Sequence, residues 1–385
     1  MERIKDGMEW AESQMEEALE LLKEWGAVPA PSGKEGLRAQ KIEGWLKAQG
    51  AEEVYLDQAG NVILELGCRE AENIAVFMAH MDVVFPDETP FTVREEDGKL
   101  YAPGIGDDTA NLVLLMLAAR KLFREKTPLR KGWGILIAAN VCEEGLGNLK
   151  GSRAICEEWK EKIRAFYSLD GYLGWAVTDA VGSHRYEVRV RTEGGHSYSA
   201  FGNPNAIHIL SGLIQSLYQV RLPGPAKTTF NVGTIEGGTT INSIAQEASM
   251  TYEFRSEDRN CLAYMEKFFQ STIQAAKDGG WEVDAKVLGI RPCSGEVEPE
   301  ALKALEDQCR KVISRYWPGD VKTKAGSTDA NIPLSMGIPA CTVGCIEGGK
   351  SHTRQEWIEI SSLLPGLNIA YGLMELYLEG IGQET

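Results

Sequence analysis

The sequence predicts an α/β protein with a mostly parallel sheet flanked by helices, and a smaller α+β domain inserted into it. Short apolar runs of the length of buried strands alternate with helical segments over residues 54–170, which is typical of a parallel sheet. After Gly182 the pattern changes to strands of alternating polarity, and it changes back after Pro292. The chain has 385 residues, more than one hydrophobic core usually holds, so two domains are expected.

The main domain is expected to begin with helices and then to form its sheet. Residues 8–25 carry apolar side chains at helical spacing, and Ser32 with Glu35 has the form of a capping box for a helix that ends near Gln49. The predicted strands lie at residues 54–56, 61–66, 74–78, 132–141, 165–169, 322–325 and 340–345, and later helices at 112–122, from 299 onward and at 361–378. Polar residues follow several of these strands directly, at the edge where open α/β sheets bind their ligands.

Residues 184–290 are expected to form the inserted domain, and residues 1–183 and 291–385 the discontinuous main domain. The predicted elements of the insertion are a strand at 184–191, a helix at 203–218, strands at 229–236 and 247–255, a helix at 261–276 and a strand at 281–288. This βαββαβ order is that of a ferredoxin-like fold.

Composition and charge restrict the classes of function. The formal net charge of −16, with no basic stripe to offset it, argues against a nucleic-acid partner. No apolar run approaches the roughly 20 residues of a membrane helix, and the acidic N-terminus lacks the pattern of a signal peptide, so a cytoplasmic location is expected. The eight cysteines are scattered along the chain, and we expect them to be reduced thiols.

Histidines and carboxylates occur at strand ends and in loops in a pattern that suits metal binding. Each cluster alone has a plainer interpretation, as a surface pair, a helix N-terminus or a solvated pair of loop charges. Together they comprise two histidines and enough carboxylates for two zinc ions that share a bridging carboxylate, with one carboxylate left as a general base. The residues concerned are His80, Asp107, Glu143, Glu144, Asp170 and His352.

The ordered set of motifs resembles a known family. The chain looks like the co-catalytic dizinc exopeptidases and deacylases, which include glutamate carboxypeptidase, peptidase T, acetylornithine deacetylase and succinyl-diaminopimelate desuccinylase. The resemblance covers nearly the whole chain and implies a zinc exopeptidase-like main domain with an inserted lid. The matching motifs are AHMD (79–82), GIGDD (104–108), CEEG (142–145), LDG (169–171), GGHS (194–197), INSI (241–244), YEFR (252–255), GSTDA (326–330) and SHTRQE (351–356).

The resemblance implies a set of metal ligands, residue by residue. His80 and Asp170 would be the terminal ligands of one zinc ion. Glu144 and His352 would be the terminal ligands of the other, and Asp107 would bridge the two. Cobalt or manganese could occupy the same ligands.

The resemblance also implies roles around the metals. Asp82 would hydrogen-bond the ring nitrogen of His80 that does not bind the metal, and Glu143 would be the general base and acid. In the lid, His196 would help to stabilise an oxyanion, while Asn242 and Arg255 would contact the substrate, the arginine by gripping a carboxylate.

Three positions near the metal motifs have other expected roles. Many members of the family have lysine where this chain has Thr109. We expect Asp108 to be a helix cap rather than a ligand. Glu356, four residues after a proposed histidine ligand, is a candidate hydrogen-bond partner of that histidine.

The predicted function is zinc-dependent hydrolysis of peptide bonds in di- or tripeptides, by attack of a metal-activated water. The GSTDA region and the lid sequence look closer to the tripeptidase branch, which favours an aminopeptidase. One alternative is an N-acyl-amino-acid deacylase or a glutamate carboxypeptidase-like enzyme, and another is a catalytically silent binding module on the same fold. Lids of this type often pair edge to edge, so a homodimer through the lid is expected.

Overall fold

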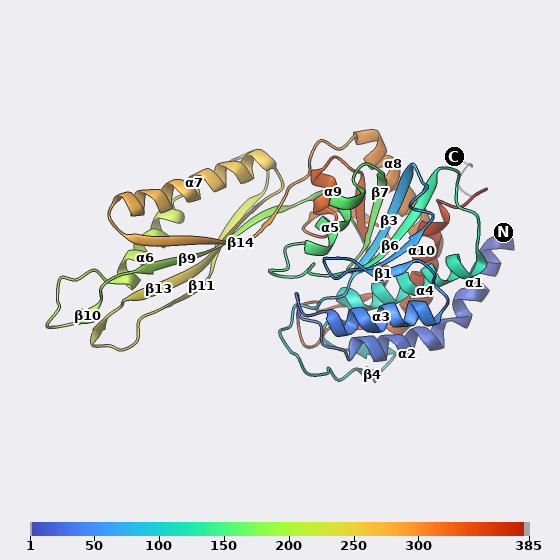
Figure 1. Cartoon of the computed structure of the whole chain (residues 1–385), viewed down its shortest axis with the longest axis horizontal. Coiled ribbons are helices and arrows are strands. Elements are labelled where there is room, and N and C mark those ends of the chain that lie inside the picture. The colour runs from blue at the N-terminus through green and yellow to red at the C-terminus, as the bar shows by residue number, and fades with distance from the viewer. Residues whose placement is uncertain (1, 381–385) are drawn as a thin grey trace. The chain divides into compact units, whose positions relative to one another are not determined.

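The computed structural model describes residues 2–380, with side chains from residue 8 onward. Its contacts divide the chain into two compact units (Figure 1). The first consists of the chain up to Asp179 and from Gly295, and the second is Ala180–Ser294. The second unit therefore begins and ends a few residues outside the 184–290 range that the sequence predicts.

The first unit contains an eight-stranded sheet in the order β1-β2-β6-β3-β7-β16-β8-β15. Its four central strands, β6, β3, β7 and β16, are parallel, whereas β1, β2 and β8 pair antiparallel at the edges. The central strands are buried on both faces, which explains their continuous apolar sequences. The strands are β1 (Val54–Leu56), β2 (Val62–Leu66), β3 (Asn73–His80), β6 (Trp133–Asn140), β7 (Ile163–Leu169), β8 (Trp175–Ala180), β15 (Lys322–Gly326) and β16 (Ala340–Val343).

Helices flank this sheet, as predicted (Figure 1), and most residues of α4 are buried. It packs against both α10 and β3, so it has apolar side chains on every face. No helix within the described residues is long and apolar enough to span a membrane. The helices of this unit are α1 (Glu2–Ser13), α2 (Met15–Gly26), α3 (Gly36–Ala48), α4 (Ala110–Glu125), α5 (Lys150–Trp159), α8 (Pro299–Tyr316), α9 (Asn331–Ser335) and α10 (Leu363–Glu375), with a π-helical turn at Ile105–Thr109.

The prediction of one helix over residues 8–25 is wrong, because the chain breaks at Gln14 between α1 and α2. The Ser13 hydroxyl donates to the Trp10 carbonyl at 2.6 Å, and the Gln14 N–H donates to the Ala11 carbonyl at 3.0 Å. These bonds compete with the regular helical ladder and tighten the last turn of α1.

A small sheet that the sequence did not predict joins two distant loops. Its order is β17-β18-β5-β4, and β18 pairs antiparallel with β5, placing Trp357 opposite Tyr101. The loop before β18 and the loop after β5 are therefore neighbours, although about 250 residues separate them in sequence. The strands are β4 (Arg94–Glu96), β5 (Lys99–Tyr101), β17 (Gly348–Gly349) and β18 (Trp357–Glu359).

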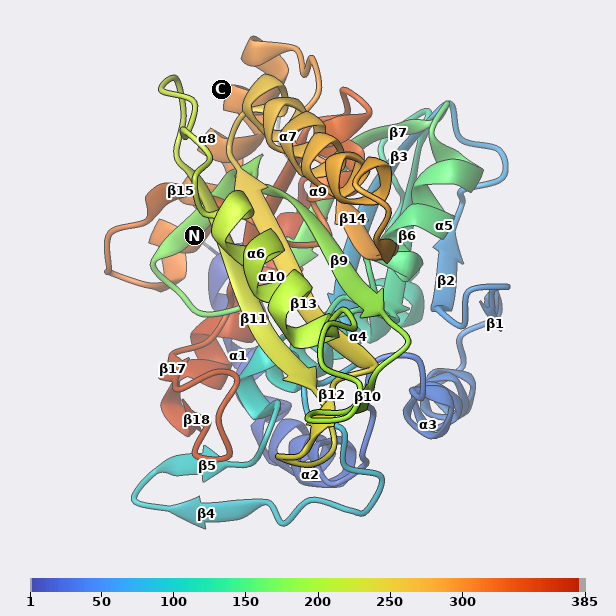
Figure 2. The ribbon, with the colours of Figure 1, turned by 90° about the vertical axis from the view of Figure 1, so that its left-hand side faces the viewer.

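The second unit has the predicted βαββαβ order. Its sheet runs β11-β13-β9-β14 with every neighbouring pair antiparallel, and α6 and α7 lie side by side over one face (Figure 2). Its elements are β9 (Gly182–Arg191), α6 (Ala206–Leu217), β11 (Thr228–Gly237), β13 (Glu247–Ser256), α7 (Arg259–Asp278) and β14 (Glu282–Arg291), with a short pair β10 (Gly195–His196) and β12 (Ser243–Ile244). Its core is separate from that of the first unit.

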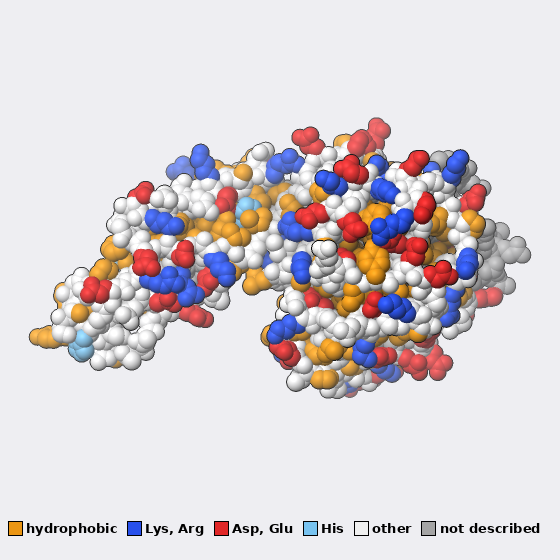
Figure 3. Space-filling view, in the orientation of Figure 1, with side chains coloured by type: hydrophobic (Ala, Val, Ile, Leu, Met, Phe, Trp, Pro, Cys, Tyr) orange, Lys and Arg blue, Asp and Glu red, His pale blue; other side chains and the backbone are white. Residues whose placement is uncertain are grey.

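The surface is charged but mixed in sign. On the face drawn in Figure 3, Lys and Arg side chains are interspersed with Asp and Glu. The net charge of −16 therefore arises partly from this solvated surface, and partly from the buried carboxylates described below.

We predict that replacing Phe269 with alanine destabilises the inserted unit by about 3–5 kcal/mol. Phe269 is fully buried on α7 and its ring contacts those of Tyr186 and Tyr252. The exposed Tyr264 lies on the same helix, so Tyr264→Ala is the matched control, with an expected loss below about 1 kcal/mol. Urea unfolding followed by circular dichroism measures both values, and equal losses would contradict the assigned core.

Candidate metal centre

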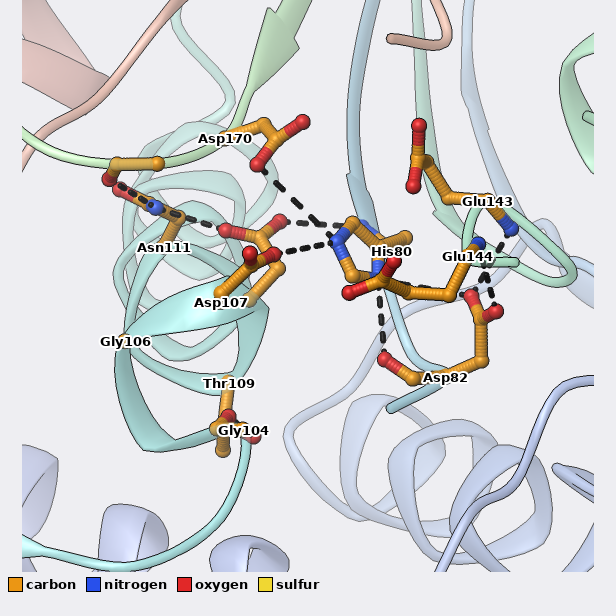
Figure 4. A network of polar contacts seen from close by, with 12 residues as sticks. His80, Asp82, Gly104, Gly106, Asp107, Thr109, Asn111, Glu143, Glu144 and Asp170 are labelled. Atoms are coloured by element: carbon orange, nitrogen blue, oxygen red, sulfur yellow. Dashed lines mark hydrogen bonds and ion pairs between the residues drawn. The ribbon is translucent and has the colours of Figure 1, made fainter. Parts of the chain in front are cut away.

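His80 lies at the carboxyl end of β3 and is the centre of the first group of polar side chains. Its ring is 1% exposed. The ring nitrogen Nε2 is 3.0 Å from Asp107 Oδ1 and 4.0 Å from Asp170 Oδ1 (Figure 4). Asp170 directly follows β7, which is the parallel neighbour of β3, so the sheet itself brings these two residues together.

His352 is the centre of a second group, which shares Asp107 with the first. Its Nε2 is 3.3 Å from Asp107 Oδ2 and 3.0 Å from Glu144 Oε1. The two oxygens of the Asp107 carboxylate therefore face two different histidines. The small sheet explains this meeting, since the Asp107 loop follows β5 and the His352 loop precedes β18.

The donor atoms of these groups are spaced as a metal site requires. Each of the sets His80–Asp107–Asp170 and Asp107–Glu144–His352 has its ligand atoms within 4.8 Å of one another, as does His80–Glu143–Glu144. Ligand atoms about 2.0–2.1 Å from a tetrahedral zinc ion lie roughly 3.3 Å apart. Glu144 Oε1 is buried and has no hydrogen-bond partner in good geometry among the described residues. An oxygen in that state fits a cation.

The electrostatics of the centre also fit a cation. Burial and the neighbouring charge of Asp107 raise the pKa of Asp170 to about 7. Burial opposes ionisation of Asp107 as well, but its hydrogen bonds to His352 and His80 hold its pKa below the usual value. Several carboxylates share a space that excludes most water, and divalent cations would offset their repulsion.

Asp82 lies in this centre, but its contacts differ from the prediction. His80 Nδ1 is 2.9 Å from the main-chain carbonyl of Asp82 and 3.4 Å from the carboxylate. The carbonyl is therefore the nearer acceptor for the ring, and the carboxylate lies beside it. The Asp82 carboxylate accepts instead from the main-chain N–H groups of Glu143 and Glu144, at 2.9 and 2.8 Å.

Glu356 contacts the turn that carries Asp107, whereas the sequence predicted a hydrogen bond to His352. Its carboxylate is 1% exposed and accepts from three main-chain N–H groups of the turn that carries Asp107. The donors are Gly104 at 2.9 Å, Gly106 at 2.9 Å and Asp107 at 2.7 Å. Glu356 thus holds the main chain of a candidate ligand.

Asp108 is not the helix cap that the sequence predicts. Its carboxylate accepts from the His80 N–H at 3.1 Å and from Asn111 Nδ2 at 2.6 Å. Asn111 also donates to the Gly171 carbonyl and accepts from the Cys345 N–H, both at 2.9 Å. This pair ties together the ends of β3, β7 and β16 beneath the candidate ligands.

The inserted unit brings two of the three predicted lid residues together. His196 and Asn242 line one hollow, and the Ser197 N–H donates to the Asn242 carbonyl at 2.9 Å. Arg255 lies at the other end of β13 from this hollow, where it forms an ion pair with Glu253 at 3.0 Å. Within this unit, Arg255 therefore does not share a site with the other two.

Ser32 and Glu35, near the centre, have other partners than the sequence predicts. Ser32 and Glu35 do not form a capping box, because neither caps α3. The Ser32 hydroxyl is 2.6 Å from Asp82 Oδ2, and Glu35 Oε1 accepts from the Cys142 N–H at 3.0 Å. Their residue types and spacing match a helix cap, so only the fold reveals their partners.

We predict that Glu356→Ala destabilises the protein by about 2–4 kcal/mol, because it leaves three buried N–H groups without their acceptor. Glu356→Gln keeps one acceptor oxygen and should lose less. The control is Glu359→Ala, which removes a half-exposed ion pair with Lys99 and should cost less than about 1 kcal/mol. Urea unfolding of metal-free protein measures all three, and a Glu356→Ala loss no larger than the control's would refute this role.

Comparison with known proteins agrees with this geometry. Residues 76–376 match the model of peptidase family M20/M25/M40. The chain is 25% identical over 346 residues to succinyl-diaminopimelate desuccinylase of Corynebacterium glutamicum, a match that covers 87% of this chain and 90% of that protein.

Solved structures share the fold. Aminopeptidase PepT from Bacillus cereus matches with a TM-score of 0.69 at 22% identity, and a tripeptidase from Staphylococcus aureus matches with 0.73 at 20%. Each match covers 94% of this chain and 98% of the other. These findings confirm the resemblance that the motifs suggested, and the chain belongs to peptidase family M20/M25/M40, a family of metal-dependent hydrolases.

Proposed function

We propose that this protein is a dizinc exopeptidase that hydrolyses di- or tripeptides from the amino end. The observation that carries the proposal is the position of Asp107, whose two carboxylate oxygens face His80 and His352. A carboxylate between two imidazoles, each with a further carboxylate beside it, is the arrangement expected of a bridged pair of metal ions.

The proposed ligands follow from the two groups of donors. His80 and Asp170 hold one ion, Glu144 and His352 hold the other, and Asp107 bridges them. Imidazole nitrogen and carboxylate oxygen are ligands that zinc accepts, and cobalt or manganese would bind the same set.

The chemistry divides between the metals and Glu143. When bound, two zinc ions supply Lewis acidity and lower the pKa of a water molecule towards neutrality. Glu143 is 5% exposed and has a carboxylate oxygen close to His80 and Glu144 ligand atoms. We assign it to take the proton of the attacking water and to deliver it to the departing amine. Asp82 accepts from its main-chain N–H, which fixes the backbone from which the carboxylate projects.

The inserted unit is proposed to contact the substrate. His196 would stabilise the oxyanion, with Asn242 beside it on the same hollow. Arg255 would bind a substrate carboxylate, for which it would have to exchange its ion pair with Glu253. A homodimer through this unit and a cytoplasmic location stay predictions from the sequence.

The choice of a peptide substrate rests on two observations. The chain's GSTDA region and lid sequence look closer to tripeptidases, and two structures with the same fold are an aminopeptidase and a tripeptidase. An acyl-amino-acid substrate is the second candidate, because a sequence relative is a desuccinylase. Both reactions cleave an amide bond at the same centre, and they differ in whether a free α-ammonium group is bound.

We predict that turnover requires both the metals and Glu143. Removing metal with a chelator should abolish hydrolysis, and zinc or cobalt should restore it. Glu143→Ala should lower kcat by at least about 10³-fold, because it removes the proton acceptor while two metal ions stay bound. Metal content is measured by mass spectrometry beside the steady-state rates. Glu157→Ala, on the exposed face of α5, is the control and should leave the rate unchanged.

The roles would be wrong if Glu143→Ala kept its activity, or if it lost its metals together with its activity. A protein that binds two metals and hydrolyses none of the substrates below would support the binding-module alternative instead.

We predict that tri-alanine and di-alanine are hydrolysed at least about tenfold faster, by kcat/KM, than N-acetyl-tri-alanine, N-acetyl-alanine or N-succinyl amino acids. A site for an α-ammonium group loses that charge interaction when the amine is acylated. The assay follows product amino acids by chromatography. Preference for an N-acylated member of the panel would replace the exopeptidase assignment with the deacylase one.

A further inference from the structure

We propose that Glu35 and Ser32 are positioning residues that hold the main chain at Cys142 and Glu144, and thereby aim Glu143 and Glu144 at the metal centre. The roles of these two glutamates come from the proposed function, on which this inference rests. The residues Pro31–Glu35 precede α3 and lie far in sequence from the loop that they contact.

Four consecutive main-chain N–H groups after β6 are bound by side-chain oxygens. The strand ends at Asn140, so these donors have no partner strand beyond it. A buried N–H group without an acceptor would cost about 1–3 kcal/mol. The acceptors are Asn61 Oδ1 for Val141, Glu35 Oε1 for Cys142, Asp82 Oδ1 for Glu143 and Asp82 Oδ2 for Glu144, at 2.9, 3.0, 2.9 and 2.8 Å.

Glu35 acts at the residue where this loop turns. Cys142 has a φ of +61°, a left-handed conformation that costs a side-chain-bearing residue roughly 1–2 kcal/mol. Glu35 Oε1 accepts from the Cys142 N–H, and also from the Gly33 N–H at 2.9 Å. One oxygen therefore joins the turn before α3 to the turn that carries the glutamates. Without it, the Cys142 N–H would lose this acceptor, and the turn would be held through the Cys142 carbonyl, which accepts from the Leu149 N–H at 3.0 Å.

Ser32 contacts Asp82 and the main chain of Glu144. Its hydroxyl is 2.6 Å from Asp82 Oδ2 and 3.2 Å from the Glu144 carbonyl oxygen. The same Asp82 oxygen accepts from the Glu144 N–H. Ser32 thus contacts both the main chain of Glu144 and the carboxylate that holds it.

A role in helix capping does not explain the burial of Glu35. The side chain is 5% exposed, and α3 begins at Gly36 without a side-chain cap. Burying a carboxylate is costly unless hydrogen bonds or a counter-charge compensate. The fully buried Arg38 interacts electrostatically with Glu35 and Asp82, and donates to the Met81 carbonyl at 2.8 Å. The positive charge of Arg38 offsets the cost of burying the carboxylates of Glu35 and Asp82.

The test compares Glu35→Ala with Glu35→Gln in the metal-loaded, full-length protein. Glu35→Ala should lower kcat by about 10–100-fold and change KM by less than about threefold, since small misplacements of catalytic groups cost that much. Glu35→Gln should stay within about threefold of the wild type in kcat, because its amide oxygen still accepts from the Cys142 N–H. Ser32→Ala should lower kcat by about 3–10-fold.

A second substitution tests the turn itself. Glycine adopts a φ of +61° without the penalty of a side chain, so Cys142→Gly in the Glu35→Ala background should restore kcat by at least about threefold. The matched controls are Glu65→Ala and Ser362→Ala, which remove buried, hydrogen-bonded side chains of the same types from the first unit. These controls should leave kcat unchanged.

A readout without turnover separates this inference from the proposed function. In the cobalt-loaded protein, Glu35→Ala should shift the visible absorption bands, because it moves the proposed ligand Glu144, whereas Glu65→Ala should not. If the wild type binds cobalt but hydrolyses nothing, the proposed function fails, and the spectra still test the positioning.

The inference is overturned if Glu35→Ala retains both the kcat and the cobalt spectrum of the wild type, or if Glu35→Gln is as defective as Glu35→Ala. If Glu35→Ala does not fold, Ser32→Ala decides, and an unchanged kcat and cobalt spectrum in that variant would overturn the inference equally.

Discussion

The central constraint of the structure is a cluster of carboxylates around the imidazoles of His80 and His352. This cluster lies at the carboxyl edge of the parallel strands. Parallel strands end at the same edge, so the residues after β3, β6 and β7 must meet there. In this chain those residues are ionisable, and burial leaves little water to screen them. Burial, together with the neighbouring charge of Asp107, raises the pKa of Asp170 to about 7. The proposed pair of divalent cations would offset this cost and supply the chemistry of the edge.

A further set of carboxylates holds this arrangement through the main chain. Asp82, Glu356 and Glu35 each accept from backbone N–H groups of the segments that carry the candidate ligands. Charge-assisted bonds of this kind are stronger than neutral ones and fix direction. The side chains of the candidate ligands and of the proposed base then project from a fixed main chain. The turn that carries Asp107 and the turn that carries Glu143 and Glu144 are both held by side chains from distant parts of the chain.

Much of the fold could be predicted because it follows from local patterns. The central strands of the main sheet are continuous apolar runs, and the strands of the inserted unit alternate, so their periods identify them. The candidate ligands could be found for the same reason, since His80 and Asp170 come directly after such runs. His352 lies in a loop, and only its place in an ordered set of motifs made it a candidate.

The parts that could not be predicted depend on contacts between distant residues. The sheet formed by β5 and β18 joins short, polar strands that have no periodic signal, yet it brings His352 to Asp107. Ser32 and Glu35 have the residue types of a capping box, and tertiary contacts override that local preference. The sequence also did not predict that Arg255 lies away from His196. Both residues belong to recognisable motifs, but only the strand register shows how far apart the motifs are.

The most direct test of this account is a crystal structure of the zinc-loaded protein with anomalous diffraction measured at the zinc edge. The account predicts two anomalous peaks roughly 3.5–4 Å apart, one beside His80 and one beside His352, with the Asp107 carboxylate between them. A single peak, or two peaks that do not share Asp107, would contradict it.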